Sequence, residues 1–196
     1  SKPRILLGFI LSTGFLSMWI SNTATALMML PMAMAIIHAM PVAHQKSKFS
    51  LLLMLSIAYA SSIGGVGTLV GSPPNTQMAA ILQKNFHITV SFFDWMKIGM
   101  PLAMTMLLVM YGVFYLALGK ERKEIHDVRL PNVSWTNEQL RALAIFGLVV
   151  VLWSFRELIT YFTGLNYGDE SAAIFGAILL FIVPGKSEKK PLLDWK

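Results

Sequence analysis

Cysteine is absent from this sequence of 196 residues, and charged side chains are scarce. The lack of cysteine excludes disulfide bonds and cysteine-ligated metal sites, and it leaves the redox compartment open. Charged residues make up 13% of the chain and hydrophobic residues 55%, which is far more apolar than an ordinary soluble domain. The composition therefore predicts an all-α polytopic membrane protein that is surrounded by lipid.

Two long segments, residues 5–45 and 49–83, contain no Asp, Glu, Lys or Arg. Proton relays inside membranes normally use carboxylates or histidines, so this absence disfavours a relay. An intramembrane hydrolase with Ser17 or Ser21 as its nucleophile would need a nearby base, and the first candidate along the chain is His38. We therefore expect no catalytic residue and no enzymatic activity, with a hydrolase as the disfavoured alternative.

The net charge of +6 comes mainly from Lys and Arg residues in short connectors between apolar segments. This placement sets membrane topology and gives no indication of a nucleic-acid partner. Residues 120–141 hold five basic side chains and residues 83–97 hold two, which puts 120–141 in the cytoplasm and 83–97 outside. Lys2 and Arg4 also favour the cytoplasm, so we expect segment 5–41 to enter and leave the membrane on one face.

Segment 5–41 is interrupted by the polar triplet Ser21-Asn22-Thr23. Residues 5–20 would form an arm of roughly 24 Å at about 1.5 Å per residue, and residues 24–37 a shorter one. Neither arm easily crosses about 30 Å of hydrocarbon. The pattern predicts a re-entrant hairpin whose polar tip lies near the middle of the bilayer. The alternative is one long tilted helix that tolerates a polar spot.

A second break lies in segment 49–83, where the sequence GGVGTLVGSPPN occupies residues 64–75. Glycines loosen a helix, and Pro73-Pro74 removes two backbone donors. The pattern predicts a discontinuous transmembrane helix with halves near 51–63 and 75–83. The ends of broken helices carry opposite partial charges, and free carbonyl groups there are ready ligands for a cation.

Oxygen atoms gather at the predicted hairpin tip. Ser17 precedes Ser21 by four residues, so both hydroxyls would share one face of a helical arm, and Asn22 would add a side-chain carbonyl. Neutral oxygen ligands suit a hard cation such as Na⁺. The alternative is that each hydroxyl bonds back to a carbonyl four residues earlier, as serines in helices often do.

The two polar motifs resemble those of the divalent anion/sodium symporter family, whose members carry dicarboxylates, tricarboxylates or sulfate. The likeness rests on the Ser-Asn-Thr tip and on the GGVGTLVGSPPN loop, and it is weaker in VVVLWSFRE and SAAIFGAILLFIVP. It extends over most of the chain. It implies two inverted repeats, each with a hairpin and a broken helix, in an elevator-type transporter that forms a homodimer. This chain would hold the end of the first repeat and the start of the second.

The resemblance also implies roles for particular residues. The sodium-site candidates are Ser17, Ser21, Asn22, Gly67 and Gly71. The substrate-binding candidates are Asn22, Thr23, Ser72 and Pro73. The residues expected to shape the loop are Gly64, Gly65, Pro74 and Asn75. The pair Gly67 and Gly71 also fits a small-xxx-small pattern of helix packing.

Three regions follow along the chain. Residues 1–119 form a transport-type region with the hairpin at 5–41, the broken helix at 49–83 and an uninterrupted spanning helix at 98–119. Residues 120–139 form a cytoplasmic connector. Residues 140–196 begin the second repeat, with transmembrane segments at 140–163 and 171–184.

The expected function is sodium-coupled symport of a small divalent anion such as succinate, malate or fumarate, in a bacterial cell membrane. Because neither charge-free segment supplies a cationic side chain, bound sodium would have to provide the positive charge that attracts the anion. The alternatives are a sulfate, arsenite or other anion permease of related fold, and a purely structural membrane subunit.

Overall fold

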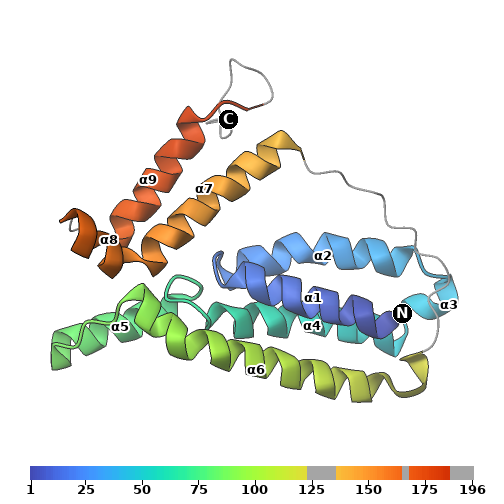
Figure 1. Cartoon of the computed structure of the whole chain (residues 1–196). Coiled ribbons are helices and arrows are strands. Elements are labelled where there is room, and N and C mark those ends of the chain that lie inside the picture. The colour runs from blue at the N-terminus through green and yellow to red at the C-terminus, as the bar shows by residue number, and fades with distance from the viewer. Residues whose placement is uncertain (123–135, 165–167, 186–196) are drawn as a thin grey trace. The chain divides into compact units, whose positions relative to one another are not determined.

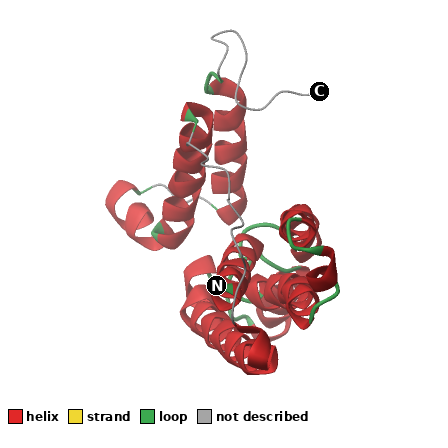
Figure 2. Cartoon of the chain, turned by 90° about the vertical axis from the view of Figure 1, so that its right-hand side faces the viewer, coloured by secondary structure: helices red, strands yellow, loops and turns green. Residues whose placement is uncertain are grey.

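The computed structural model describes residues 1–122, 136–164 and 168–185, and every secondary-structure element in these ranges is a helix (Figure 2). The chain forms two compact units, Ser1–Leu130 and Pro131–Lys196, each described by itself below. Three of the helices are long and apolar enough to cross a membrane: Lys48–Gly65, Phe92–Leu118 and Asn137–Ser154. These features fit an integral membrane protein with several spans.

The first unit is built around four helices that lie side by side (Figure 1). Its elements are α1 (Lys2–Ser17), α2 (Asn22–His38), α3 (Val42–Gln45), α4 (Lys48–Gly65), α5 (Pro73–Phe86), α6 (Phe92–Leu118) and the 3₁₀ turn η1 (Gly119–Arg122). The core lies between α1, α2, α4 and α6. Its fully or almost fully buried members include Leu6, Ile10, Phe49, Leu53 and Leu107.

Helices α1 and α2 form an antiparallel hairpin (Figure 1). The helical hydrogen bonds of α1 end at Ser17, and α2 begins at Asn22 with Ser21 as its N-cap. The alternative of one long tilted helix is therefore wrong. The arms hold 16 and 17 residues, or roughly 24 and 26 Å at about 1.5 Å per residue, which is less than the hydrocarbon thickness.

The predicted helix break is present between α4 and α5, seven residues that Figure 1 shows as a loop beyond the hairpin tip. Both halves are longer than predicted, because α4 continues to Gly65 and α5 starts at Pro73. Proline is tolerated in the first turn of a helix, where its missing N–H would have no intrahelical partner. Pro73-Pro74 therefore starts α5, whereas α4 has already ended at Gly65, within the glycine run.

Close packing of α1 on α4 depends on Gly14 and Gly64. A Cβ atom on Gly64 would overlap the backbone carbonyl of Gly14, and a Cβ on Gly14 would lie 2.6 Å from a methyl carbon of Leu107. The backbones of the two helices consequently touch without an intervening side chain. Such an approach is available only to glycine.

Helix α6 begins at Phe92, six residues before the predicted start at 98. Ser91 caps it by accepting a hydrogen bond from the Asp94 amide at 3.2 Å. Asp94 and Lys97 lie in the first turns of the helix and pair with each other at 2.9 Å. The prediction excluded these residues because they are charged, although a local pair of this kind is readily accommodated on a helix surface.

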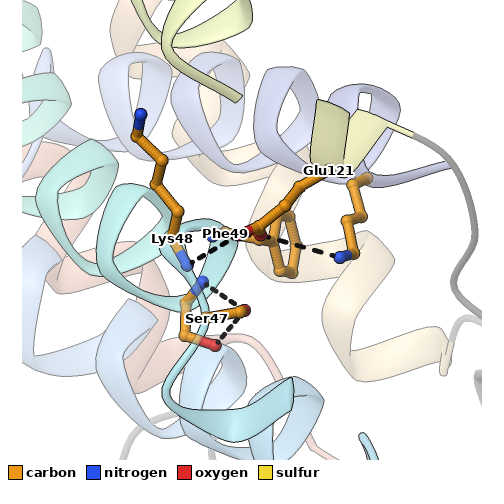
Figure 3. A network of polar contacts seen from close by, with 6 residues as sticks. Ser47, Lys48, Phe49 and Glu121 are labelled. Carbon is orange, nitrogen blue, oxygen red and sulfur yellow. Dashed lines mark hydrogen bonds and ion pairs between the residues drawn. The ribbon is translucent and has the colours of Figure 1, made fainter. Parts of the chain in front are cut away.

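A polar network joins three helix termini (Figure 3). It lies at the end of the unit opposite the hairpin tip (Figure 1). The carboxylate of Glu121 accepts hydrogen bonds from the backbone amides of Lys48 and Phe49, at 3.4 and 3.2 Å. It also lies 3.8 Å from the Lys2 ammonium. The start of α1, the start of α4 and the turn after α6 are thereby tied together.

The second unit contains α7 (Asn137–Ser154), α8 (Arg156–Thr163) and α9 (Asp169–Ile182). The predicted single segment 140–163 is divided at Phe155, whose φ of −110° and ψ of 19° depart from helical geometry. Helices α7 and α9 pack through Gly176 against Val149, and the Arg141 guanidinium donates to the Pro184 carbonyl at 2.6 Å. Most of the predicted connector 120–139 lies outside the described residues.

Candidate functional site

The hairpin tip meets the end of α4 through Ser17. Its Oγ atom lies 2.7 Å from Asn22 Oδ1 and 2.5 Å from the carbonyl oxygen of Ser61. Ser17 is fully buried. A serine hydroxyl carries one proton, and here that proton faces two oxygen acceptors. The bond to Ser61 also excludes the alternative in which Ser17 simply bonds back within its own helix.

Backbone carbonyl groups converge beside Gly71. A Cβ atom on this residue would lie 2.7 Å from the Gly65 carbonyl oxygen. It would lie 2.9 and 3.0 Å from those of Ser17 and Met18. The end of α1, its C-cap residue and the end of α4 thus present oxygen atoms to one point beside Gly71, and glycine is required there because any side chain would fill it.

Asn22 is held against the same point. A Cβ on Gly65 would overlap Asn22 Oδ1 and lie 3.1 Å from the Gly71 carbonyl oxygen. The amide oxygen of Asn22 therefore rests on the backbone at the end of α4. Gly65 therefore lies in contact with both Asn22 and Gly71. These two residues are separated in the sequence by most of the hairpin and all of α4.

The loop after α4 is fixed by side chains that the sequence analysis did not single out as ligands or loop braces. Thr68 Oγ1 donates to the Met18 carbonyl and accepts from the Gly71 amide at 3.1 Å. Trp95 Nε1 donates to the Val66 carbonyl at 2.9 Å. These contacts join residues as far as 50 positions apart, so no local spacing in the sequence could reveal them.

Asn75, a candidate for shaping the loop, is hydrogen-bonded to two backbone carbonyls. Its Nδ2 atom donates to the Gly65 carbonyl at 2.8 Å and to the Thr68 carbonyl at 2.7 Å. The side chain is 7% exposed and ties the first turn of α5 to the end of α4. The two helix halves are therefore held together by hydrogen bonds although the helix itself is broken.

Ser21 departs from its predicted position. It is exposed, and its Oγ accepts a hydrogen bond from the Ala24 amide at 3.3 Å as the N-cap of α2. The expected common helical face with Ser17 is wrong, because the chain leaves the helix between the two serines. Thr23, in the first turn of α2, is also exposed.

The other loop candidates surround the oxygen cluster without all pointing into it. Gly67 packs against Met18, and its carbonyl oxygen would lie 3.1 Å from a Cβ on Gly99 of α6. Ser72 is half-buried and precedes α5, while Pro73 and Pro74 are exposed in its first turn. Gly64 forms the backbone contact with α1 described above.

The cluster is electrically neutral but lies at helix ends. Helices α1 and α4 end beside it, and α2 and α5 begin beside it, so negative and positive helix-end partial charges adjoin. Among the described residues, no group of His, Cys, Asp or Glu could hold a metal ion. The neutral oxygen atoms of serine, asparagine and backbone carbonyl groups are suitable ligands for a hard cation.

A helix hairpin and a broken helix that share a neutral oxygen cluster, within an apolar helical chain, define a membrane transporter of the discontinuous-helix class. A family model described as citrate transporter matches residues 1–194. The chain belongs to this family of transporters, which is not a family of enzymes.

Curated relatives carry a more specific name. The sodium-dependent dicarboxylate transporter SdcS of Staphylococcus saprophyticus is 36% identical over 215 residues, covering 100% of this chain and 41% of that protein. The protein of the same name from Staphylococcus aureus strain USA300 is 35% identical over 217 residues, with the same coverage. The chain thus spans 41% of the length of these relatives.

Proposed function

We propose that this chain provides half of the transport site of a sodium-coupled symporter for a divalent anion, such as a C4-dicarboxylate. The names of its relatives support sodium and a dicarboxylate as the transported species. The transported anion and the coupling ion are both small, so a compact polar cluster within an apolar bundle is a suitable place for them.

The observation that carries the proposal is the convergence of oxygen acceptors at one point. The Ser17 hydroxyl has one proton for two acceptors, and the carbonyls of Ser17, Met18 and Gly65 converge near Gly71. A carbonyl oxygen has two lone pairs, so the Met18 and Gly65 oxygens, which accept from Thr68 and Asn75, each keep one that a cation can coordinate. Ser17, Asn22 and the backbone around Gly71 would hold sodium, which supplies positive charge to this uncharged region.

The anion would then be recognised mainly at the start of α2. Thr23 is exposed in the first turn of that helix, where amide groups and the helix dipole favour a carboxylate. The start of α5 offers less, since Pro73 and Pro74 lack N–H groups and the Asn75 amide donates to the Ser72 carbonyl at 3.0 Å. In this half-site, α5 would contribute shape and α2 would contribute hydrogen bonds.

We place the α1–α2 hairpin as re-entrant, with its tip inside the membrane. The short arms support this placement, as does the gathering of Lys2, Arg4, Lys46 and Lys48 at the end of the unit opposite the tip. The proposal extends to an inverted second repeat, a homodimer and elevator-type movement of the site. The tight contact between Gly14 and Gly64 supports a hairpin that moves together with α4.

Uptake of labelled succinate tests the proposal. The full-length transporter would be reconstituted in proteoliposomes, with an inward sodium gradient or with choline in its place. We expect accumulation only with sodium, and competition by malate and fumarate. Sodium-independent uptake would overturn the coupling. Competition by sulfate or arsenite alone would instead assign the protein to the other anion permeases.

A thermal-shift titration separates a transport subunit from a purely structural one. Sodium should raise the melting temperature of the detergent-solubilised protein relative to choline at equal ionic strength, because a ligand that binds only the folded state stabilises it. Equal melting temperatures in the two salts would favour the structural role.

A further inference from the structure

We propose that Thr68 is a positioning residue that couples the hairpin tip to the loop of the broken helix, and so sets the sodium affinity of the site. This inference rests on the proposed function. Thr68 is fully buried and lies in the loop between α4 and α5. It is not among the residues assigned to sodium or substrate binding.

The hydroxyl of Thr68 both donates and accepts a hydrogen bond. It donates its one proton to the Met18 carbonyl at the hairpin tip, and it accepts the Gly71 amide at 3.1 Å. Met18 supplies one carbonyl of the cluster and Gly71 is the residue beside which the cluster forms, since the Met18 oxygen would lie 3.0 Å from a Cβ on Gly71. One side chain therefore fixes the spacing of two parts of the cluster.

The backbone of Thr68 is fixed in turn. Its carbonyl oxygen accepts from Asn75 Nδ2 at 2.7 Å, and the same amide group reaches the Gly65 carbonyl at 2.8 Å. Gly65 is the residue on which Asn22 rests. A closed circuit of contacts thus runs from the hairpin through Thr68 and Asn75 to Gly65, and back to the hairpin at Asn22.

These contacts explain how the conformation of the loop would affect the affinity of the site for sodium. Thr68 contributes no atom to the point beside Gly71, but without its hydroxyl the Met18 carbonyl and the Gly71 amide both lose a buried partner. Either group could then rotate, and the oxygen atoms would no longer be held at cation-binding distance. A pre-organised site binds its ion more tightly because less ordering accompanies binding.

The test compares Thr68→Val, which keeps the shape of the side chain and loses the hydroxyl, with Thr68→Ser, which keeps the hydroxyl. In the full-length transporter, we expect Thr68→Val to raise the half-saturating sodium concentration about tenfold, with a maximal rate near that of the unmodified protein. In Thr68→Ser, the half-saturating sodium concentration should stay within about threefold of that of the unmodified protein. Thr105→Val is the matched control, because that hydroxyl is exposed and donates to the Pro101 carbonyl of its own helix, at 2.8 Å.

Two readouts separate the possible failures. If the unmodified protein shows no sodium dependence, the proposed function fails before the variants are considered. If it does, and Thr68→Val lowers the sodium-free melting temperature but leaves the half-saturating sodium concentration unchanged, Thr68 is merely structural and this inference is wrong. Should Thr68→Val not fold, an unchanged sodium dependence in Asn75→Ala, which removes the neighbouring link of the circuit, would contradict the coupling.

Discussion

The ammonium group of Lys2 lies 3.8 Å from the Glu121 carboxylate, which links the first turn of α1 to the turn that follows α6. Lys2 is 6% exposed and also lies over the Phe49 ring, 5.7 Å from its centroid. The carboxylate caps the start of α4 at the same time (Figure 3). One acidic residue therefore compensates a buried cation and a helix N-terminus.

We expect Glu121→Gln to destabilise the protein by about 1–2 kcal/mol, because the amide keeps one acceptor but loses the charge that favours both partners. Thermal unfolding of the full-length protein would show a lower melting temperature. Transport by the folded fraction should keep its half-saturating sodium concentration, since the network lies at the opposite end of the hairpin from the oxygen cluster.

Lys97→Gln is the control for the loss of an ion pair. Lys97 and Asp94 are 56% and 47% exposed, and such surface pairs contribute little. A melting temperature that falls as much in Lys97→Gln as in Glu121→Gln would show that burial and capping add nothing at Glu121.

Asn22→Ala should abolish transport at ordinary substrate concentrations. The substitution removes the amide oxygen that faces Ser17 and rests on Gly65. Sodium-dependent succinate uptake is the measurement, and Asn85→Ala is the control, because Asn85 is exposed near the end of α5. Near-normal uptake by Asn22→Ala would remove Asn22 from the site.

The two serines of the hairpin should differ. Ser17→Ala removes a buried hydroxyl with two oxygen partners, and we expect it to raise the half-saturating sodium concentration by about tenfold or more. Ser21→Ala removes an exposed N-cap, which costs about 1 kcal/mol of helix stability. Its effect on the half-saturating sodium concentration should be smaller. A larger increase in Ser21→Ala than in Ser17→Ala would indicate that Ser21 is the main sodium ligand of the two.

Gly64→Ala should prevent correct assembly of the bundle, because its new Cβ would overlap the Gly14 carbonyl. Low yield of monodisperse protein after size-exclusion chromatography is the expected result. Gly112→Ala on α6 is the matched control, since nothing lies within 4 Å of its added Cβ. Glycine is a poor helix former, so this control should be neutral or slightly stabilising. Equal yields would contradict the backbone contact.

The sequence predicts the hairpin and the broken helix because both leave local signals. Charge-free segments identify the membrane region, and Ser21-Asn22-Thr23 and the glycine-proline run mark where helices stop. Helix ends are predicted less well. Asp94 falls inside α6 although it is charged, and the division of segment 140–163 at Phe155 has no glycine or proline to indicate it.

The contacts that organise the candidate site were not predictable from spacing. Thr68 meets Met18 across 50 residues, and Ser17 meets Ser61 across 44. A backbone carbonyl is present at every residue, so the sequence does not indicate which one the Thr68 hydroxyl bonds to. The spacing of Ser17 and Ser21 is misleading, because four residues place two side chains on one face only within a continuous helix. Here α1 ends at Ser17, and Ser21 is the N-cap of α2.

The backbones of Gly14 and Gly64 lie so close that even a methyl group on Gly64 would overlap the Gly14 carbonyl. A hairpin joined to its neighbour through side chains could shift by exchanging rotamers, but two backbones in direct contact cannot. In the proposed elevator-type movement, this contact predicts that α4 would move together with the hairpin tip and that the sliding surface would lie on the outer faces of this pair.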